Sequence, residues 1–164
     1  QVTILGMFYG AKRIDLIKPM IKYTMMWAIL IASCFSIFIF FCIEDIAPLF
    51  LTASSEEEIA MSNSAINTTI SYYKIMAFIY PFIGITMVST RAMQAIGIAW
   101  PMMATAILRV LILQCTMTYI FIVIMGKDIY WAWYAIAFSC IAAAFFAYSM
   151  RVYFYNRLIN HLKV

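Results

Sequence analysis

Long apolar segments with few or no charges are the main feature of this sequence. Tyr23 to Ile43 holds 21 residues without a charge. At 1.5 Å of rise per residue, a helix of that length crosses the ~30 Å hydrocarbon core of a membrane. Three later segments have a similar length and composition. We therefore expect an all-α integral membrane fold with four transmembrane helices, at residues 23–43, 73–95, 101–125 and 129–150.

More polar segments flank these spans. Residues 1–22 begin with an apolar stretch that is too short to cross a membrane and continue as a basic loop. We interpret the apolar stretch as the end of a preceding helix and expect the chain to be a fragment, the alternative being a processed but complete protein. Residues 44–72 are expected to form an outer loop and the start of the second spanning helix, and residues 151–164 a tail.

The stretch from Tyr72 to Pro101 is interrupted near its middle by Pro81 and Gly84. A proline inside a helix removes one backbone donor and bends the helix. In lipid the carbonyl freed four residues earlier must find another partner, so such a helix is expected to lie among other helices or to line a wet cavity. The bend either suits helix packing alone or provides a flexible wall for alternating access.

Small residues recur at every fourth position on two of the predicted spans. Such stripes allow two helices to approach closely in lipid, where no hydrophobic force drives their association. For the stripe on the first span, a chance spacing is the alternative. The two stripes are Ala28, Ala32 and Ser36 on the first span, and Ala135, Ser139, Ala143 and Ala147 on the fourth.

The composition narrows the possible functions. Hydrophobic residues make up 66% of the chain and charged residues 11%, against about 25% charged residues in a typical soluble domain. The net charge of +4 comes from basic residues near the ends of apolar spans, which favours lipid headgroups over nucleic acid as partners. The four cysteines lie inside apolar segments without CxxC spacing, so we expect small buried side chains, neither disulfides nor metal ligands.

Polar groups that could support chemistry are scarce. The single histidine, His161, lies in the tail, and no span contains paired carboxylates. General acid–base and nucleophilic catalysis therefore lack their usual groups, and we expect no catalytic residues and no enzyme.

A few polar residues within the spans are candidates for a substrate pathway. Arg109 lies about 12 Å into the bilayer by helical rise, so it either snorkels to headgroups or faces a wet interior. Gln114 lies deeper, where its amide bonds a neighbouring helix or contacts substrate. Lys74 is expected to form an interfacial ion pair with Glu44 or Asp128. The hypothetical pathway consists of Pro81, Gly84, Thr86, Arg109 and Gln114.

Five short motifs follow one another along the chain. They are Gln1 with Gly6, Gly10-Ala11-Lys12-Arg13, Pro48-Leu49-Phe50-Leu51-Thr52, Arg91 to Gly97 with Pro101 after it, and Trp131-Ala132-Trp133. In this order and spacing they resemble the multidrug and toxic compound extrusion (MATE) family over nearly the whole chain.

The resemblance implies a fold of twelve helices in two six-helix repeats. This chain would supply the last four helices of one repeat, and the basic tail after the last span indicates the C-terminal repeat. Members of the family export organic, often cationic, compounds by alternating access in exchange for protons or sodium ions. The resemblance thus implies an efflux antiporter of the cell membrane without a bound cofactor. Its partners would be membrane lipids, small organic substrates and the rest of the transporter chain.

Two departures from the family pattern limit what the resemblance assigns. The acids that other members carry on earlier helices would lie upstream of Gln1. Some members carry a membrane-embedded acid on the helix that corresponds to the second span, whereas Ile75 to Gly97 contains none. The resemblance therefore assigns no coupling-ion residue here. Flippases of lipid-linked saccharides share the architecture and are the alternative within transport. A small four-span scaffold that binds partners through its small-residue faces is the alternative from another class.

The distribution of basic residues predicts the orientation in the membrane. Four basic residues precede the first span, whereas the segment between the first two spans has Lys74 against five acidic residues. Three more, Arg151, Arg157 and Lys163, follow the last span. Because basic residues are enriched on the cytoplasmic side, both ends of the chain are expected in the cytoplasm.

This topology can be tested with a tag at Val164. In intact cells the tag is expected to escape an impermeant label, and after permeabilisation it is expected to react. A tag placed in the expected outer loop at Thr52 serves as the control, because it should react in both conditions. Labelling of the Val164 tag in intact cells would show the topology to be wrong.

Overall fold

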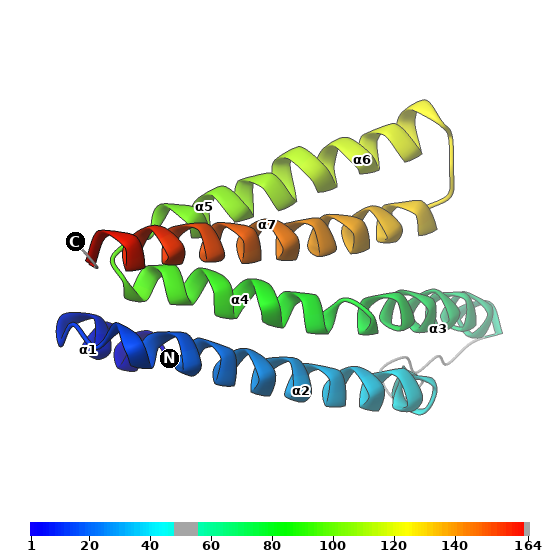
Figure 1. The fold of residues 1–164 in the computed structure, drawn as a ribbon. Helices are drawn as coiled ribbons and strands as arrows, with labels where there is room; N and C mark the ends of the chain where they lie inside the picture. The colour runs from blue at the N-terminus through cyan, green and yellow to red at the C-terminus, as the bar shows by residue number, and fades with distance from the viewer. Residues whose placement is uncertain (48–55, 163–164) are drawn as a thin grey trace.

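The computed structural model describes residues 1–47 and 56–162, which form helices joined by short turns (Figure 1). A short helix α1 (Val2–Gly10) precedes the long helix α2 (Ile14–Ile46). The next pair is α3 (Glu56–Ala77) and α4 (Tyr80–Ala95). A continuous helical rod then consists of α5 (Trp100–Ile107), the π-helical segment η2 (Leu108–Cys115), α6 (Thr116–Tyr119) and the π-helical segment η3 (Ile120–Ile124). The last helix described is α7 (Tyr130–Leu162).

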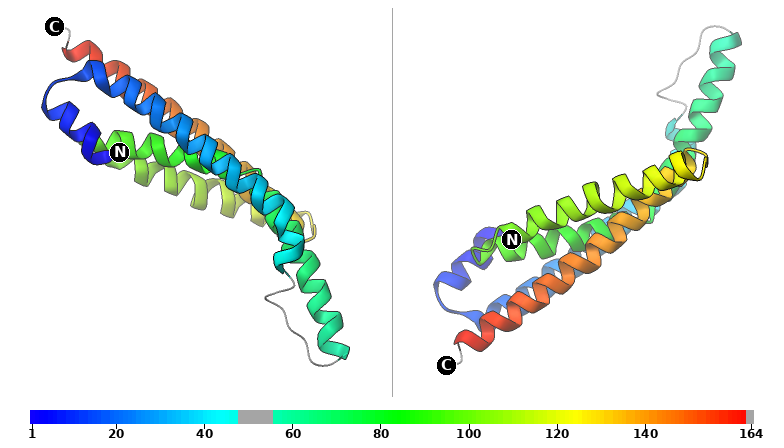
Figure 2. Two further views of the ribbon diagram at one scale, coloured as in Figure 1. Left: turned by 90° about the horizontal axis from the view of Figure 1, so that it is seen from below. Right: turned by 90° about the horizontal axis from the view of Figure 1, so that it is seen from above.

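Helix α4 holds the central position in the bundle. It contacts α1, α2, α5 and α7, and Figure 1 shows it running between α2 and α7. The α5–η3 rod packs against α7. The far part of α3 extends beyond the other helices, as both views in Figure 2 show. The N-terminal part of α2 and the C-terminal part of α7 lie at the same end of the bundle.

The lengths and compositions of the helices fit a membrane protein. Three stretches are long and apolar enough to cross a membrane, Asp15–Ile46, Trp100–Ile124 and Tyr130–Leu158, and the bent pair Ser64–Ala77 and Tyr80–Ala95 is a fourth if it counts as one span. Large apolar side chains are exposed along the outer faces of these helices. Such faces suit a lipid environment or further helices. The expectation of an all-α membrane fold is thus confirmed.

The helices extend beyond the spans expected from hydropathy. Helix α2 begins in the basic segment before Tyr23, and α7 continues past Met150 through the region expected to be a tail. Both extensions carry charged residues on helices that are apolar along most of their length. The hydropathy pattern marks the apolar part of a helix, whereas backbone hydrogen bonding continues beyond it. The Pro48 to Thr52 motif in the expected outer loop lies outside the described residues.

A bend of 48° separates α3 from α4 at Phe78 and Ile79. Pro81 stands in the first turn of α4 and has no N–H to donate to the carbonyl of Ala77, four residues earlier. The Ser36 hydroxyl of α2 donates a hydrogen bond to this Ala77 carbonyl. The second helix therefore supplies the partner that the proline removes, in agreement with the expected burial of this break among other helices.

The two small-residue stripes lie at helix contacts. A Cβ atom added to Gly84 of α4 would lie 3.5 Å from the Ala28 carbonyl oxygen and 3.8 Å from the Ala32 Cβ. This close approach of α4 to α2 brings Ser36 within reach of Ala77. On α7 the side chains of Ala135, Ser139, Ala143 and Ala147 are all buried, so that stripe forms a packed face.

A glycine cap ends helix α4. At the C-terminus of α4, Gly97 has a φ of 84°, and the Gly97 and Ile98 amides donate to the carbonyls of Gln94 and Met93. This is a Schellman cap, which requires the left-handed backbone that glycine adopts without strain.

An ion pair joins α3 to α2. The Lys74 ammonium of α3 lies 2.5 Å from the Glu44 carboxylate of α2. The expected ion pair of Lys74 thus forms with Glu44 and not with Asp128.

One expectation about the cysteines is wrong. All four are free thiols, and Cys140 is buried. Cys34 and Cys115, however, are exposed on their helices. Hydropathy places a residue within a span but does not tell which face of the helix it occupies, and these two lie on outward faces.

The hydrogen bond at the bend leads to a prediction about stability. In Ser36→Ala the Ala77 carbonyl loses its partner, and we expect the protein to lose about 1 kcal/mol, within the range found for hydrogen bonds between membrane helices. In a Pro81→Ala background the new amide at position 81 can bond the same carbonyl. The additional effect of Ser36→Ala is then expected to be close to zero.

A double-mutant cycle of unfolding free energies in detergent measures this coupling. Ser33→Ala is the matched control, because Ser33 lies on the same helix and is half-buried. Equal losses from Ser36→Ala in the two backgrounds would show that the hydroxyl does not replace the missing amide at position 81.

Candidate functional site

A small cavity of about 90 Å³ lies between α4 and the α5–η2 rod. It includes Thr86 and Arg109, two of the residues that the sequence indicates for a substrate pathway. Its full lining is Ile83, Thr86, Met87 and Thr90 from α4, and Met102, Thr105, Ala106 and Arg109 from α5 and η2.

Three threonine hydroxyls give the cavity its polar character. Each donates to a backbone carbonyl of its own helix: Thr86 to Phe82 at 3.0 Å, Thr90 to Thr86 at 2.9 Å and Thr105 to Pro101 at 2.7 Å. A hydroxyl that has donated its proton keeps lone pairs as acceptors. The cavity wall therefore offers acceptor oxygens without exposing unpaired backbone groups.

Arg109 contributes the positive charge of this cavity. It stands at the second position of η2 and is half-buried. Among the described side chains, two ion pairs form, Arg13 with Asp15 and Lys74 with Glu44, and Arg109 belongs to neither. It lies at the cavity between α4 and the α5–η2 rod. A guanidinium in a low-dielectric setting needs acceptors, which water or substrate oxygens can supply.

The volume limits what this cavity can bind by itself. A water molecule takes about 30 Å³ in the liquid, so 90 Å³ holds on the order of three waters. Pockets for small organic ligands measure roughly 300–1,000 Å³. The cavity can thus hold water beside Arg109 and the threonines, but an organic substrate needs additional space beyond these helices.

The other three predicted pathway residues lie outside this cavity. Pro81 forms the bend that orients α4, and Gly84 faces Ala28 and Ala32 of α2, so its role here is close packing. Gln114 lies on η2 and is half-buried. Since hydrogen bonds in a π-helix join residues five apart, Gln114 is about one turn from Arg109.

Sequence reasoning missed Thr90, Thr105 and Met102 as part of this cavity. A signal for two of them was present, because Thr86 and Thr90 are four residues apart, as are Thr105 and Arg109. Residues four apart share one face of a helix. The meeting of these two faces depends on the turn at Gly97, which folds α5 back toward α4.

The described residues contain no group of three or more His, Cys, Asp or Glu side chains placed to hold a metal ion. The lining residues of the cavity also include no nucleophile paired with a base. Its hydroxyls, thioethers and one guanidinium can solvate or bind a molecule without reacting with it.

Comparisons with known proteins place the chain in a family. No curated protein and no solved structure matches it. The family model described as MatE matches residues 2–120, a range that includes α1 to α6 and ends before the Trp131-Ala132-Trp133 motif. Since the match covers well over half of the chain, this protein belongs to the MatE family, whose members are multi-helix membrane transporters.

Proposed function

We propose that this chain forms part of an efflux antiporter of the cell membrane. It exports small organic, often cationic, compounds by alternating access in exchange for protons or sodium ions, with both chain ends in the cytoplasm. Membership in the MatE family supports transport as such. The family match does not favour a lipid or polysaccharide flippase.

The observation that carries the proposal is the hydrogen bond at the bend between α3 and α4. The Ala77 carbonyl is bonded by a side chain of another helix, Ser36 of α2. Hydrogen bonds between membrane helices average about 0.6 kcal/mol. This hydrogen bond is weak, so it adds little resistance to a change in the angle between α3 and α4, as a moving wall of a transport path requires.

Movement of this wall acts on the candidate cavity. Ile83, Thr86, Met87 and Thr90 all follow the bend on α4, so a change in its angle shifts them relative to Arg109 on η2. The substrate site would be completed by the rest of the transporter chain. A cationic substrate would bind closer to the threonines and methionines than to Arg109, because like charges repel.

Ion coupling in this proposal is indirect. Helix α4 contains no acidic residue between Tyr80 and Ala95. The proton or sodium ion would bind to groups on other helices, and α4 would respond through its bend. Alternating access needs such a two-state element, whose position the ion and the substrate both bias.

Pro81→Ala tests the moving wall. The new amide adds a hydrogen bond of about 1 kcal/mol to the straight form, which shifts the balance between bent and straight helix roughly fivefold. We expect efflux of a fluorescent organic cation by the complete transporter to fall by a similar factor, with normal expression and unchanged melting behaviour. Pro19→Ala is the matched control, because Pro19 is exposed within α2 and away from the cavity. Unchanged efflux in Pro81→Ala would remove the moving wall from the mechanism.

The driving force can be tested in vesicles that contain the complete transporter. Export of the same cation is expected to stop when both the proton gradient and the sodium gradient are collapsed, and to resume when one of them is restored. The gradient that restores it identifies the coupling ion. Export that is indifferent to both gradients would contradict antiport, and movement of labelled lipid in place of the cation would indicate a flippase.

A further inference from the structure

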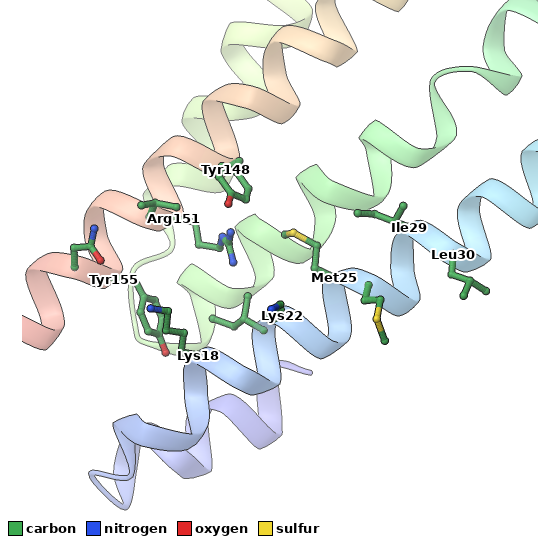
Figure 3. Close-up of a pocket in the computed structure, with 12 residues that line it drawn as sticks. Lys18, Lys22, Met25, Ile29, Leu30, Tyr148, Arg151 and Tyr155 are labelled. Carbon is green, nitrogen blue, oxygen red and sulfur yellow. The ribbon is translucent and has the colours of Figure 1, made fainter.

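A groove of about 900 Å³ runs between α2 and α7, at the end of the bundle where α2 begins and α7 ends (Figure 3). It is separate from the small cavity between α4 and α5. Its volume lies at the upper end of the range for small-molecule sites. The labelled side chains in Figure 3 come from both helices. Lys18, Lys22, Met25, Ile29 and Leu30 belong to α2, and Tyr148, Arg151 and Tyr155 belong to α7.

Three positive charges surround one end of this groove. Lys18 and Lys22 are four residues apart on α2, and Arg151 lies opposite them on α7. Neither of the two ion pairs formed by the described side chains includes any of these three residues. Like charges this close to one another repel, and an anion between them would remove that repulsion.

The wall of the groove also contains polar atoms that lack a partner. The Nε of Arg151 and the hydroxyl of Tyr155 are buried and make no hydrogen bond within the described part of the chain. Tyr155 as a whole is only 7% exposed. The Arg151 guanidinium stacks on the Tyr148 ring at 4.5 Å, which holds it at the groove. Buried donors are normally satisfied, and phosphate oxygens are strong acceptors for arginine.

The opposite end of the groove is apolar. From Lys22 the lining continues along α2 through Met25, Met26, Ile29 and Leu30 toward the middle of the helix. Lys18 and Leu30 are separated by about 18 Å at helical rise, a large part of one membrane leaflet. The groove therefore changes from cationic to apolar in the direction in which a phospholipid changes from headgroup to acyl chain.

We propose that this groove binds an anionic phospholipid of the membrane. The phosphate lies between Lys18, Lys22 and Arg151, and one acyl chain lies along Met25, Ile29 and Leu30. A lysine near the end of a span places its ammonium at headgroup depth, and basic sites between transmembrane helices are suited to acidic lipids. A free phosphate would leave the apolar end empty, so the lipid is the occupant that fits both ends. The inference does not depend on the substrate or the coupling ion of the transporter.

The first experiment measures lipid retention by native mass spectrometry. The complete transporter is purified in detergent and mixed with phosphatidylglycerol or phosphatidylcholine. We expect selective retention of phosphatidylglycerol, and a loss on the order of 100-fold in its apparent affinity in the triple variant Lys18→Gln, Lys22→Gln, Arg151→Gln, since each basic residue near an anionic surface contributes roughly fivefold. The matched control, Lys12→Gln, Lys127→Gln, Arg157→Gln, removes the same charge from exposed positions outside the groove.

The outcomes separate this proposal from its alternatives. Equal losses in the two triple variants would show a general charge effect and overturn the site. Displacement of phosphatidylglycerol by millimolar inorganic phosphate would show an anion site without lipid specificity, and equal retention of phosphatidylcholine would show an apolar surface only. Either result would also overturn the proposal.

A second experiment uses the unaltered protein, so it remains informative if the triple variant does not fold. Phosphatidylglycerol with a photoreactive group on its acyl chain is crosslinked in vesicles, and the labelled peptides are identified by mass spectrometry. We expect labels on the segments around Met25 to Leu30 and around Tyr148 to Val152. Labels restricted to other helices, which would also result if a further segment of the transporter covered the groove, would overturn the proposal.

Discussion

The structure depends on a hydrogen bond to one backbone carbonyl, that of Ala77. Pro81 leaves the Ala77 carbonyl without its helical donor, and a membrane interior offers no water as a replacement. Ser36 of α2 supplies the hydrogen bond. It can do so because Ala28, Ala32 and Gly84 bring α2 and α4 close together. The small-residue stripe, the central place of α4 and the 48° bend are therefore parts of one arrangement.

This arrangement relates the fold to transport. Because α4 contacts helices on several sides, its direction determines the shape of the space beside it. The cavity with Thr86 and Arg109 lies between α4 and the α5–η2 rod. At the bend a single side chain replaces the missing amide, and this weak hydrogen bond adds only a small resistance to movement. The threonines suit such a moving surface, because their hydroxyls already satisfy their own helices.

Charge in this protein is segregated along the helices. Arg13 with Asp15 and Lys74 with Glu44 neutralise one another near opposite ends of α2. Between the start of α2 and the end of α7, in contrast, three basic side chains face a groove without a carboxylate among its lining residues. A cluster of basic side chains without a carboxylate, beside the apolar part of the groove, suits an amphiphilic anion. The membrane around the protein contains many such lipids.

The sequence alone determined the features that depend on local chemistry. The length and apolarity of each segment predicted the membrane helices, and Pro81 predicted the bend and a carbonyl in need of a partner. Only the tertiary structure decided which groups meet: Ser36 with Ala77, Lys74 with Glu44 in place of Asp128, and Thr90 and Thr105 with the predicted Thr86 and Arg109. In a soluble protein the apolar face of a helix indicates where it packs. In lipid nearly every face of a helix is apolar, and helix association is driven by close contacts and single hydrogen bonds. The hydropathy pattern therefore does not predict which helix faces pack together.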